Sequence, residues 1–248
     1  MDKKTLGIIG VIVVVFAAVI GISVWQSSGK NDFANVDEID HELLEVDYST
    51  YPVNQIVKAD KFTGGLEENI EGNPDAPVLI FEYADYQCEG CAAWNPYMNK
   101  LLEEYKGKIA LVFRTYIMSY HQNGLASASA ANAAGIQGYW REYSNLLYTN
   151  QDDWYSASAR RRQELFEKYF EEVTDGKGDM QKFRTDMQSD AVAQKIAFDR
   201  GMAEKVNLDW TPTIYVGDTL VQREQMNNSF MDTMRELIDA ELEKKGVK

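Results

Sequence analysis

Cys88 and Cys91 are the two cysteines of the chain, and their C-x-x-C spacing suits thiol–disulfide exchange. An apolar run ends shortly before the pair and a helical pattern begins at it. Unpaired backbone N–H groups and the positive end of a helix dipole favour the thiolate, which is the form that attacks disulfides. We therefore predict that Cys88 is the exposed nucleophile and that Cys91 resolves the mixed disulfide. The alternative is two inert buried cysteines or a structural disulfide.

Glu82 interrupts the apolar run VLIFEY at residues 78–83, six residues before Cys88. Strand alternation and the following turn could bring its side chain beneath the cysteine pair. A buried carboxyl group there would have a raised pKa and could carry protons to or from Cys91. An acid at the edge of a sheet, or facing solvent, is the alternative interpretation.

A third candidate is the sequence WTPT, where Trp210, Thr211 and Pro212 precede an apolar strand pattern. Proline lacks a backbone N–H group, and in a turn it can follow a cis peptide bond. A loop of this kind opposite the cysteines could offer backbone groups to an extended substrate peptide. A simple proline at the start of a strand would have the same spacing.

The elements around these residues predict an α/β fold. An apolar strand at residues 78–83, a helix at 91–106 and a strand at 109–116 form a parallel βαβ unit, with the cysteines at the corner between strand and helix. Two short strands at 213–216 and 219–222 follow much later in the chain. A closing helix at 229–245 carries apolar residues at helical spacing, which we expect to face the sheet: Met231, Met234, Leu237, Ile238 and Leu242.

Between these parts, residues 121–207 show helical patterns and no strand pattern. The sequence predicts an all-helical subdomain inserted into the α/β domain. Its expected helices lie at 125–134, 139–147, 159–173, 180–188 and 191–206.

The N-terminal run at residues 6–25 is apolar and uncharged, and it is long enough to span a membrane. Because Lys3 and Lys4 precede it, we expect a cytoplasmic N-terminus and an extracytoplasmic catalytic domain. A cleaved signal peptide is the alternative, and both interpretations export the domain. The polar, acid-rich residues 26–70 are expected to be a tether, with a short helix around 36–46.

The net charge of −14, from 39 acidic and 25 basic residues, disfavours nucleic-acid binding. A structural zinc site needs about four Cys or His ligands. Besides the cysteine pair the chain offers only His41 and His121, so we predict no metal and no cofactor other than the redox-active pair. The absence of a Gly-x-Ser-x-Gly motif gives a hydrolase little support.

Taken together, these residues resemble the DsbA-like branch of the thioredoxin superfamily, in particular its membrane-anchored Gram-positive (BdbD-like) type. The resemblance rests on GNPDAPVLIFEYADYQCEGC with Glu82, on the helix residue Pro96, on the stretch from His121 through WREYSNLLYTNQDDW, and on Thr211-Pro212. It implies a thioredoxin fold formed by residues 71–120 and 208–248, with 121–207 as the helical insertion and a cis Pro212. It also implies oxidation of exported proteins and a quinone-linked membrane protein that re-oxidises the pair.

The sequence departs from this family at Glu89 and Gly90, where many relatives have proline or histidine, and at Trp210, where a small residue is common. A carboxylate beside Cys88 disfavours its thiolate, and Gly90 loosens the helix start. We therefore expect a milder oxidant that leans toward reductase or isomerase activity. Trp210 is either a substrate contact or a packing residue. A non-catalytic binding or chaperone module is the alternative from a different class of function.

Overall fold

The computed structural model of the chain describes residues 43–247. The predicted membrane segment at 6–25 lies outside the described residues, as do residues 36–42 of the predicted short helix, whose remainder at 43–46 is not helical. Among the described helices, none is both long and apolar enough to cross a membrane.

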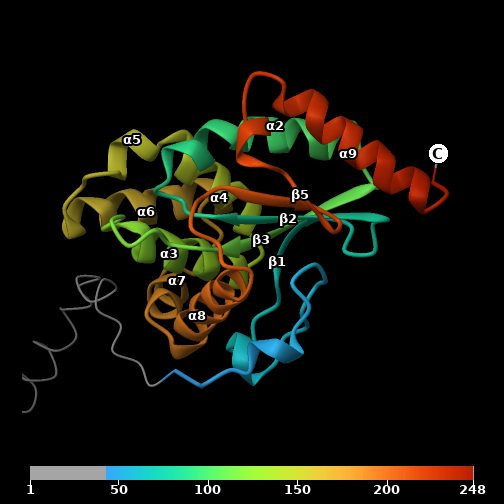
Figure 1. The fold of residues 1–248 in the computed structure, drawn as a ribbon. Coiled ribbons are helices and arrows are strands. Elements are labelled where there is room, and N and C mark those ends of the chain that lie inside the picture. Colours follow the sequence, from blue (N-terminus) through green and yellow to red (C-terminus); the bar gives the residue numbers. More distant parts are fainter. Residues whose placement is uncertain (1–42, 248) are drawn as a thin grey trace, which may run out of the picture. The chain divides into compact units, whose positions relative to one another are not determined.

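Five strands form one mixed sheet in the order β1-β3-β2-β4-β5 (Figure 1). The parallel strands β2 (Val78–Ala84) and β3 (Ile109–Thr115) are joined by α2 (Glu89–Glu104), as predicted. β4 (Thr213–Val216) pairs antiparallel with β2, and the short β5 (Thr219–Leu220) pairs with β4. The residues that follow β2 and β3 therefore meet the residues that precede β4 at one edge of the sheet.

One face of the sheet is covered by α2 and by α9 (Phe230–Lys244) (Figure 1). Val78 and Ile80 of β2 point to this face, and so does Glu82, because side chains alternate along a strand. Burying these apolar side chains favours the fold by about 25 cal/mol per Å². The core on this side contains Val78, Ile80, Met98, Leu101, Ile109, Leu111, Ile214, Val216, Val221, Phe230, Met234, Ile238 and Leu242.

The opposite face of the sheet packs against α8 (Asp190–Lys205). Phe81 and Tyr83 alternate with the residues of the first face and meet Phe198 and Met202 of α8 in a second core. Both faces of β2 are therefore buried, which explains its nearly continuous apolar sequence.

The insertion between β3 and β4 is helical throughout, as predicted, and Ser158, Asp179 and Ser189 cap three of its helices by accepting a hydrogen bond from a first-turn N–H group. Besides α8 it contains α3 (Gly124–Ile136), α4 (Trp140–Thr149), α5 (Gln151–Trp154), α6 (Ala159–Thr174) and α7 (Met180–Met187). The short α5 was not predicted, because four residues are too few to show a helical period.

The structure differs from the predicted tether in residues 43–70. Two short 3-10 helices, Tyr48–Thr50 and Lys61–Thr63, precede β1 (Asn69–Gly72), which extends the sheet antiparallel to β3. An ideal Cβ atom on Gly201 of α8 would lie 1.9 Å from the Tyr48 ring, so this segment packs tightly on the helix. A four-residue edge strand with the sequence NIEG carries too little apolar pattern to be predicted.

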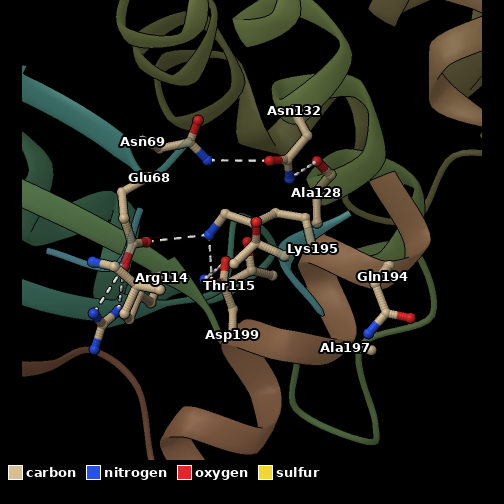
Figure 2. A network of polar contacts seen from close by, with 12 residues as sticks. Glu68, Asn69, Arg114, Thr115, Ala128, Asn132, Gln194, Lys195, Ala197 and Asp199 are labelled. Atoms are coloured by element: carbon tan, nitrogen blue, oxygen red, sulfur yellow. Dashed lines mark hydrogen bonds and ion pairs between the residues drawn. The ribbon is translucent and has the colours of Figure 1, made fainter. Parts of the chain in front are cut away.

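A buried ionic network connects Glu68, in the segment before β1, to Arg114 of β3 and to Lys195 of α8 (Figure 2). Glu68 accepts hydrogen bonds from Arg114 Nε and Nη2 at 3.1 and 2.8 Å and from Lys195 Nζ at 3.2 Å. Lys195 also pairs with Asp199, which accepts a hydrogen bond from the Thr115 backbone N–H at 3.1 Å. All four charged side chains are at most 2% exposed, so two buried carboxylates balance two buried cations.

Candidate active site

The cysteine pair lies at the sheet edge where β2 and β3 end, at the start of α2. Cys88 is the N-cap residue of α2, with φ −74° and ψ 119°, and its backbone N–H donates to the Asp85 carbonyl at 3.0 Å. Cys88 is partly exposed, whereas Cys91, in the first turn of the helix, is fully buried. Both cysteines are free thiols in the structure. The exposed and buried members of the pair are therefore those that the sequence predicts.

The loop before β4 closes over the pair. The peptide bond between Thr211 and Pro212 is cis, and the Cys88 thiol donates to the Thr211 carbonyl at 3.4 Å. An ideal Cβ atom on Gly90 would lie 3.5 Å from both Cys88 Sγ and Pro212 Cδ, so Gly90 faces this loop directly. The structure thus brings Thr211 and Pro212 beside the cysteines, as predicted.

The surroundings of the two thiols shift their pKa values in opposite directions. A hydrogen bond from Cys91 lowers the pKa of Cys88 to about 6, and the Thr211 side chain and the backbone N–H groups of Gly90 and Cys91 act in the same direction against burial. Burial raises the pKa of Cys91 well above its usual value, and the charges of Cys88 and Glu82 raise it further. These pKa shifts favour the thiolate at Cys88 and the protonated thiol at Cys91 at neutral pH.

Glu82 lies buried on the α2 side of the sheet, where its charge acts on both cysteines. Burial raises the pKa of Glu82 to about 7, and the thiolate of Cys88 adds to this effect, whereas Arg141 opposes it. The carboxyl group therefore exchanges its proton near neutral pH. This is the placement that the sequence predicts for a proton carrier.

Glu89, the residue expected to tune the cysteine pair, is the first residue of α2. Its side chain is exposed to solvent, and the pKa of Cys88 is lowered although this carboxylate is its sequence neighbour. Water screens an exposed charge, whereas the hydrogen bonds to Cys88 act at short range. Glu89 therefore does not prevent thiolate formation.

Trp210 is half-buried, and the guanidinium carbon of Arg223 lies 5.6 Å from its ring centroid. The cation covers one face of the ring, and the side chain stays partly accessible beside the cis-proline loop.

Sequence reasoning missed an ionisable pair beside Cys88. His121 Nδ1 and Asp85 Oδ2 are 2.6 Å apart, and Asp85 also accepts backbone hydrogen bonds from Gln87 and Met118. Burial opposes the imidazolium, but the hydrogen bond and the charge of Asp85, with Cys88, raise the pKa of His121 above its usual value. Both residues follow parallel strands, so their positions at the same sheet edge could have suggested the pair.

The helical insertion also contacts the active-site loop. Gln151 Nε2 donates to the Tyr86 and Cys88 carbonyls at 2.7 and 3.1 Å, and Gln87 Nε2 donates to the Tyr155 carbonyl at 2.8 Å. Within residues 43–247, no group of three or more Cys, His, Asp or Glu side chains is arranged to hold a metal ion.

A partly exposed thiol at a helix start, a buried second thiol, a buried carboxyl group and a cis-proline loop are the features of a thioredoxin-fold thiol–disulfide oxidoreductase. Residues 66–240 match the family model described as Thioredoxin, and the chain belongs to this family.

Named relatives agree with this class of enzyme. The probable disulfide bond formation protein D of Bacillus cereus is 29% identical over 182 residues, which cover 70% of this chain and 78% of the relative. The structure of oxidised BdbD from Bacillus subtilis matches with a TM-score of 0.60 and 21% identity, over 77% of this chain and all of that one. Wolbachia pipientis α-DsbA1 matches with a TM-score of 0.56 and 19% identity, over 71% and 94% of the two chains. The chain is a DsbA-like protein thiol:disulfide oxidoreductase.

Proposed function

We propose that this protein donates disulfide bonds to exported proteins outside the cytoplasm. The observation that carries the proposal is the contrast between the two thiols: Cys88 is partly exposed with a pKa lowered to about 6, and Cys91 is buried and protonated. A stable thiolate in the reduced enzyme makes the disulfide form a better oxidant.

The reaction begins when a substrate thiolate attacks Cys88 Sγ of the oxidised pair. A bond forms between the substrate sulfur and Cys88, the Cys88–Cys91 bond breaks, and Cys91 leaves with the electron pair. Glu82, whose pKa of about 7 supports the role, would give Cys91 a proton. A second substrate thiolate then attacks the substrate sulfur of the mixed disulfide and releases Cys88 as a thiolate. The substrate has lost two electrons, and the enzyme is reduced.

The loop at Thr211 and Pro212 would align the substrate during this exchange. Its backbone lies against Cys88, where an extended peptide could pair with it, and the half-buried Trp210 offers an apolar contact beside it.

The cellular setting is part of the proposal. Residues 6–25 would anchor the protein with its catalytic domain outside the cytoplasm, where protein disulfides persist. A quinone-linked membrane protein would restore the Cys88–Cys91 disulfide after each cycle. The relatives named for disulfide bond formation support the proposed direction of exchange.

The test is single-turnover oxidation of a reduced, unfolded secreted protein by the oxidised full-length chain, followed by counting free thiols. We expect one substrate disulfide per enzyme molecule, and no substrate oxidation with Cys91→Ser or with Cys88→Ser/Cys91→Ser, because neither variant can form the internal disulfide that accepts the two electrons. If the oxidised chain leaves the substrate thiols intact, while the reduced chain reduces or rearranges the disulfides of an oxidised substrate protein, the protein would be a reductase or isomerase. A double variant that still assists refolding would indicate a chaperone.

A further inference from the structure

A second unusual group lies beside the buried thiol, the hydroxyl of Tyr148 in α4. The side chain is 6% exposed, and its hydroxyl finds no hydrogen-bond partner among residues 43–247. An unpaired buried hydroxyl costs about 1–3 kcal/mol, so such groups are uncommon away from functional sites.

Neighbouring hydrogen bonds fix where this hydroxyl lies. Asn145, one turn before Tyr148, accepts hydrogen bonds from Asn95 and Asn99 of α2 at 2.9 and 3.0 Å. Gln151, one turn after Tyr148, donates to the Cys88 carbonyl at 3.1 Å. The chain of α4 and α5 therefore runs antiparallel to α2, with its later residues beside the start of α2.

Tyr148 lies between these two contacts in the chain, and one helical turn separates it from Asn145 on the same side of α4. On the facing chain, Cys91 lies between the N-cap residue Cys88 and Asn95 of α2. The register places the Tyr148 side chain over Cys91. Electrostatics agree with this placement, because burial raises the pKa of Tyr148 well above its usual value and Cys91 is the charged neighbour with the largest further effect.

The other ionisable groups that face this hydroxyl come from β2 and from the loop after it: Glu82, Asp85 and Tyr86. Two of them already have hydrogen-bond partners. The Tyr86 hydroxyl is paired with Ser144 Oγ and with Trp140 Nε1, and the Asp85 carboxylate with His121 and two backbone N–H groups. Of these ionisable groups, Cys91 and Glu82 are the two to which the Tyr148 hydroxyl could donate a hydrogen bond.

We propose that Tyr148 is a further catalytic residue, whose hydroxyl donates a hydrogen bond to Cys91 Sγ when that sulfur leaves as a thiolate. When a thiolate attacks Cys88, the electron pair of the broken disulfide bond moves to Cys91 in a pocket without solvent access. A phenol that is otherwise unpaired stabilises this charge until Cys91 takes a proton. The inference rests on exchange at Cys88–Cys91, as the proposed function does, but it holds for either direction of electron flow.

The test compares Tyr148→Phe with wild type in the attack of reduced glutathione on the oxidised protein at pH 7, in single-turnover experiments. We expect the variant to react about tenfold more slowly, as for the loss of one hydrogen bond in the transition state. Tyr169→Phe is the matched control, because Tyr169 is 2% exposed and its hydroxyl also lacks a partner among the described residues, while the charged groups that act on it are Asp153, Arg161 and Glu172 and not the cysteines or Glu82. We expect the control to react at the wild-type rate.

Two further measurements separate the possible outcomes. The pH profile of Cys88 alkylation should be the same in Tyr148→Phe and wild type, and a shifted profile would mean a general distortion and overturn the inference. The rate difference between Tyr148→Phe and wild type should persist when both proteins also carry Glu82→Gln. If it disappears, the Tyr148 hydroxyl acts through Glu82 and not on Cys91. An active wild type with an equally active Tyr148→Phe would refute the role of Tyr148 alone, whereas an inactive wild type would refute the proposed function.

Discussion

Cys88 and Cys91 are three residues apart, but their surroundings favour opposite protonation states. Cys88 stands at the helix start among hydrogen-bond donors, and Cys91 lies one turn deeper beside a carboxyl group without solvent access. Burial disfavours the charged form of a thiol, whereas hydrogen bonds to the thiolate favour it. One helical turn between the two positions is therefore enough to give the two thiols different exposure and opposite pKa shifts.

This contrast predicts the alkylation behaviour of the reduced protein. The rate of iodoacetamide alkylation at Cys88 should rise with pH to a midpoint of about 6, because only the thiolate reacts. Cys91 should stay unmodified over the same range. Mass spectrometry of the quenched protein identifies the modified residue. A midpoint near 8.5, the ordinary value for cysteine, would show that the helix start does not stabilise the thiolate.

A second prediction concerns Glu82 and stability. Its pKa is about 7 in the folded protein and 4.5 ordinarily, so between these pH values the folded state holds more protons than the unfolded state. Stability is then lost as pH rises from 4.5 to 7, by about 3 kcal/mol from this group. In Glu82→Gln this contribution should be absent. Urea denaturation of both reduced proteins at pH 4.5 and 8 measures it, and equal pH dependence in the two would contradict the raised pKa.

The sequence identified the site residues whose signal is local. The spacing of Cys88 and Cys91 and an acid in an apolar strand can be recognised within ten residues. The Asp85–His121 pair was missed because its members are 36 positions apart and neither interrupts a periodic pattern. The proposed role of Tyr148 has no local signal, because an aromatic residue in a helix ordinarily indicates packing, and the lack of a partner for its hydroxyl among residues 43–247 is seen only in the structure.

At the scale of elements, β2 and β4 were predictable from their apolar runs, and the helices of the insertion other than α5 from their length and helical patterns. β1 and the preceding segment were not, because their stability comes from distant partners. Glu68 is 46 positions from Arg114 and 127 from Lys195. From the sequence alone, an acidic residue with no nearby partner predicts an exposed segment.

The four charged residues of the buried network, Glu68, Arg114, Lys195 and Asp199, should contribute to the free energy of unfolding in a non-additive way. Lys195→Met should cost about 3–5 kcal/mol, because it leaves Glu68 and Asp199 with one cation between them. Adding Asp199→Asn should recover part of that loss by removing the surplus charge. Urea denaturation of wild type, both single variants and the double variant gives the coupling energy. Additive effects would show that the network does not act as a unit.

At the scale of the whole molecule, the described part of the chain before β1 belongs to the folded domain. Gly201 lets α8 approach the Tyr48 ring, and Tyr48 contacts the Phe198 ring and donates a hydrogen bond to the Ala197 carbonyl of this helix. Gly201→Ala should therefore destabilise the protein by about 1–3 kcal/mol through overpacking. The penalty should shrink in a Tyr48→Ala background, and thermal unfolding of the four proteins tests it. An equal penalty in both backgrounds would assign the effect to the helix alone.

The account as a whole is tested most directly by the reduction potential of the Cys88–Cys91 couple, measured on the full-length chain in glutathione redox buffers. A Cys88 pKa of about 6 lies between those of thioredoxin, about 7, and DsbA, about 3.5. We therefore predict a potential of about −200 mV, that of a moderate disulfide donor. A potential at or below about −270 mV, as in thioredoxin, would contradict the proposed direction and identify the protein as a reductant.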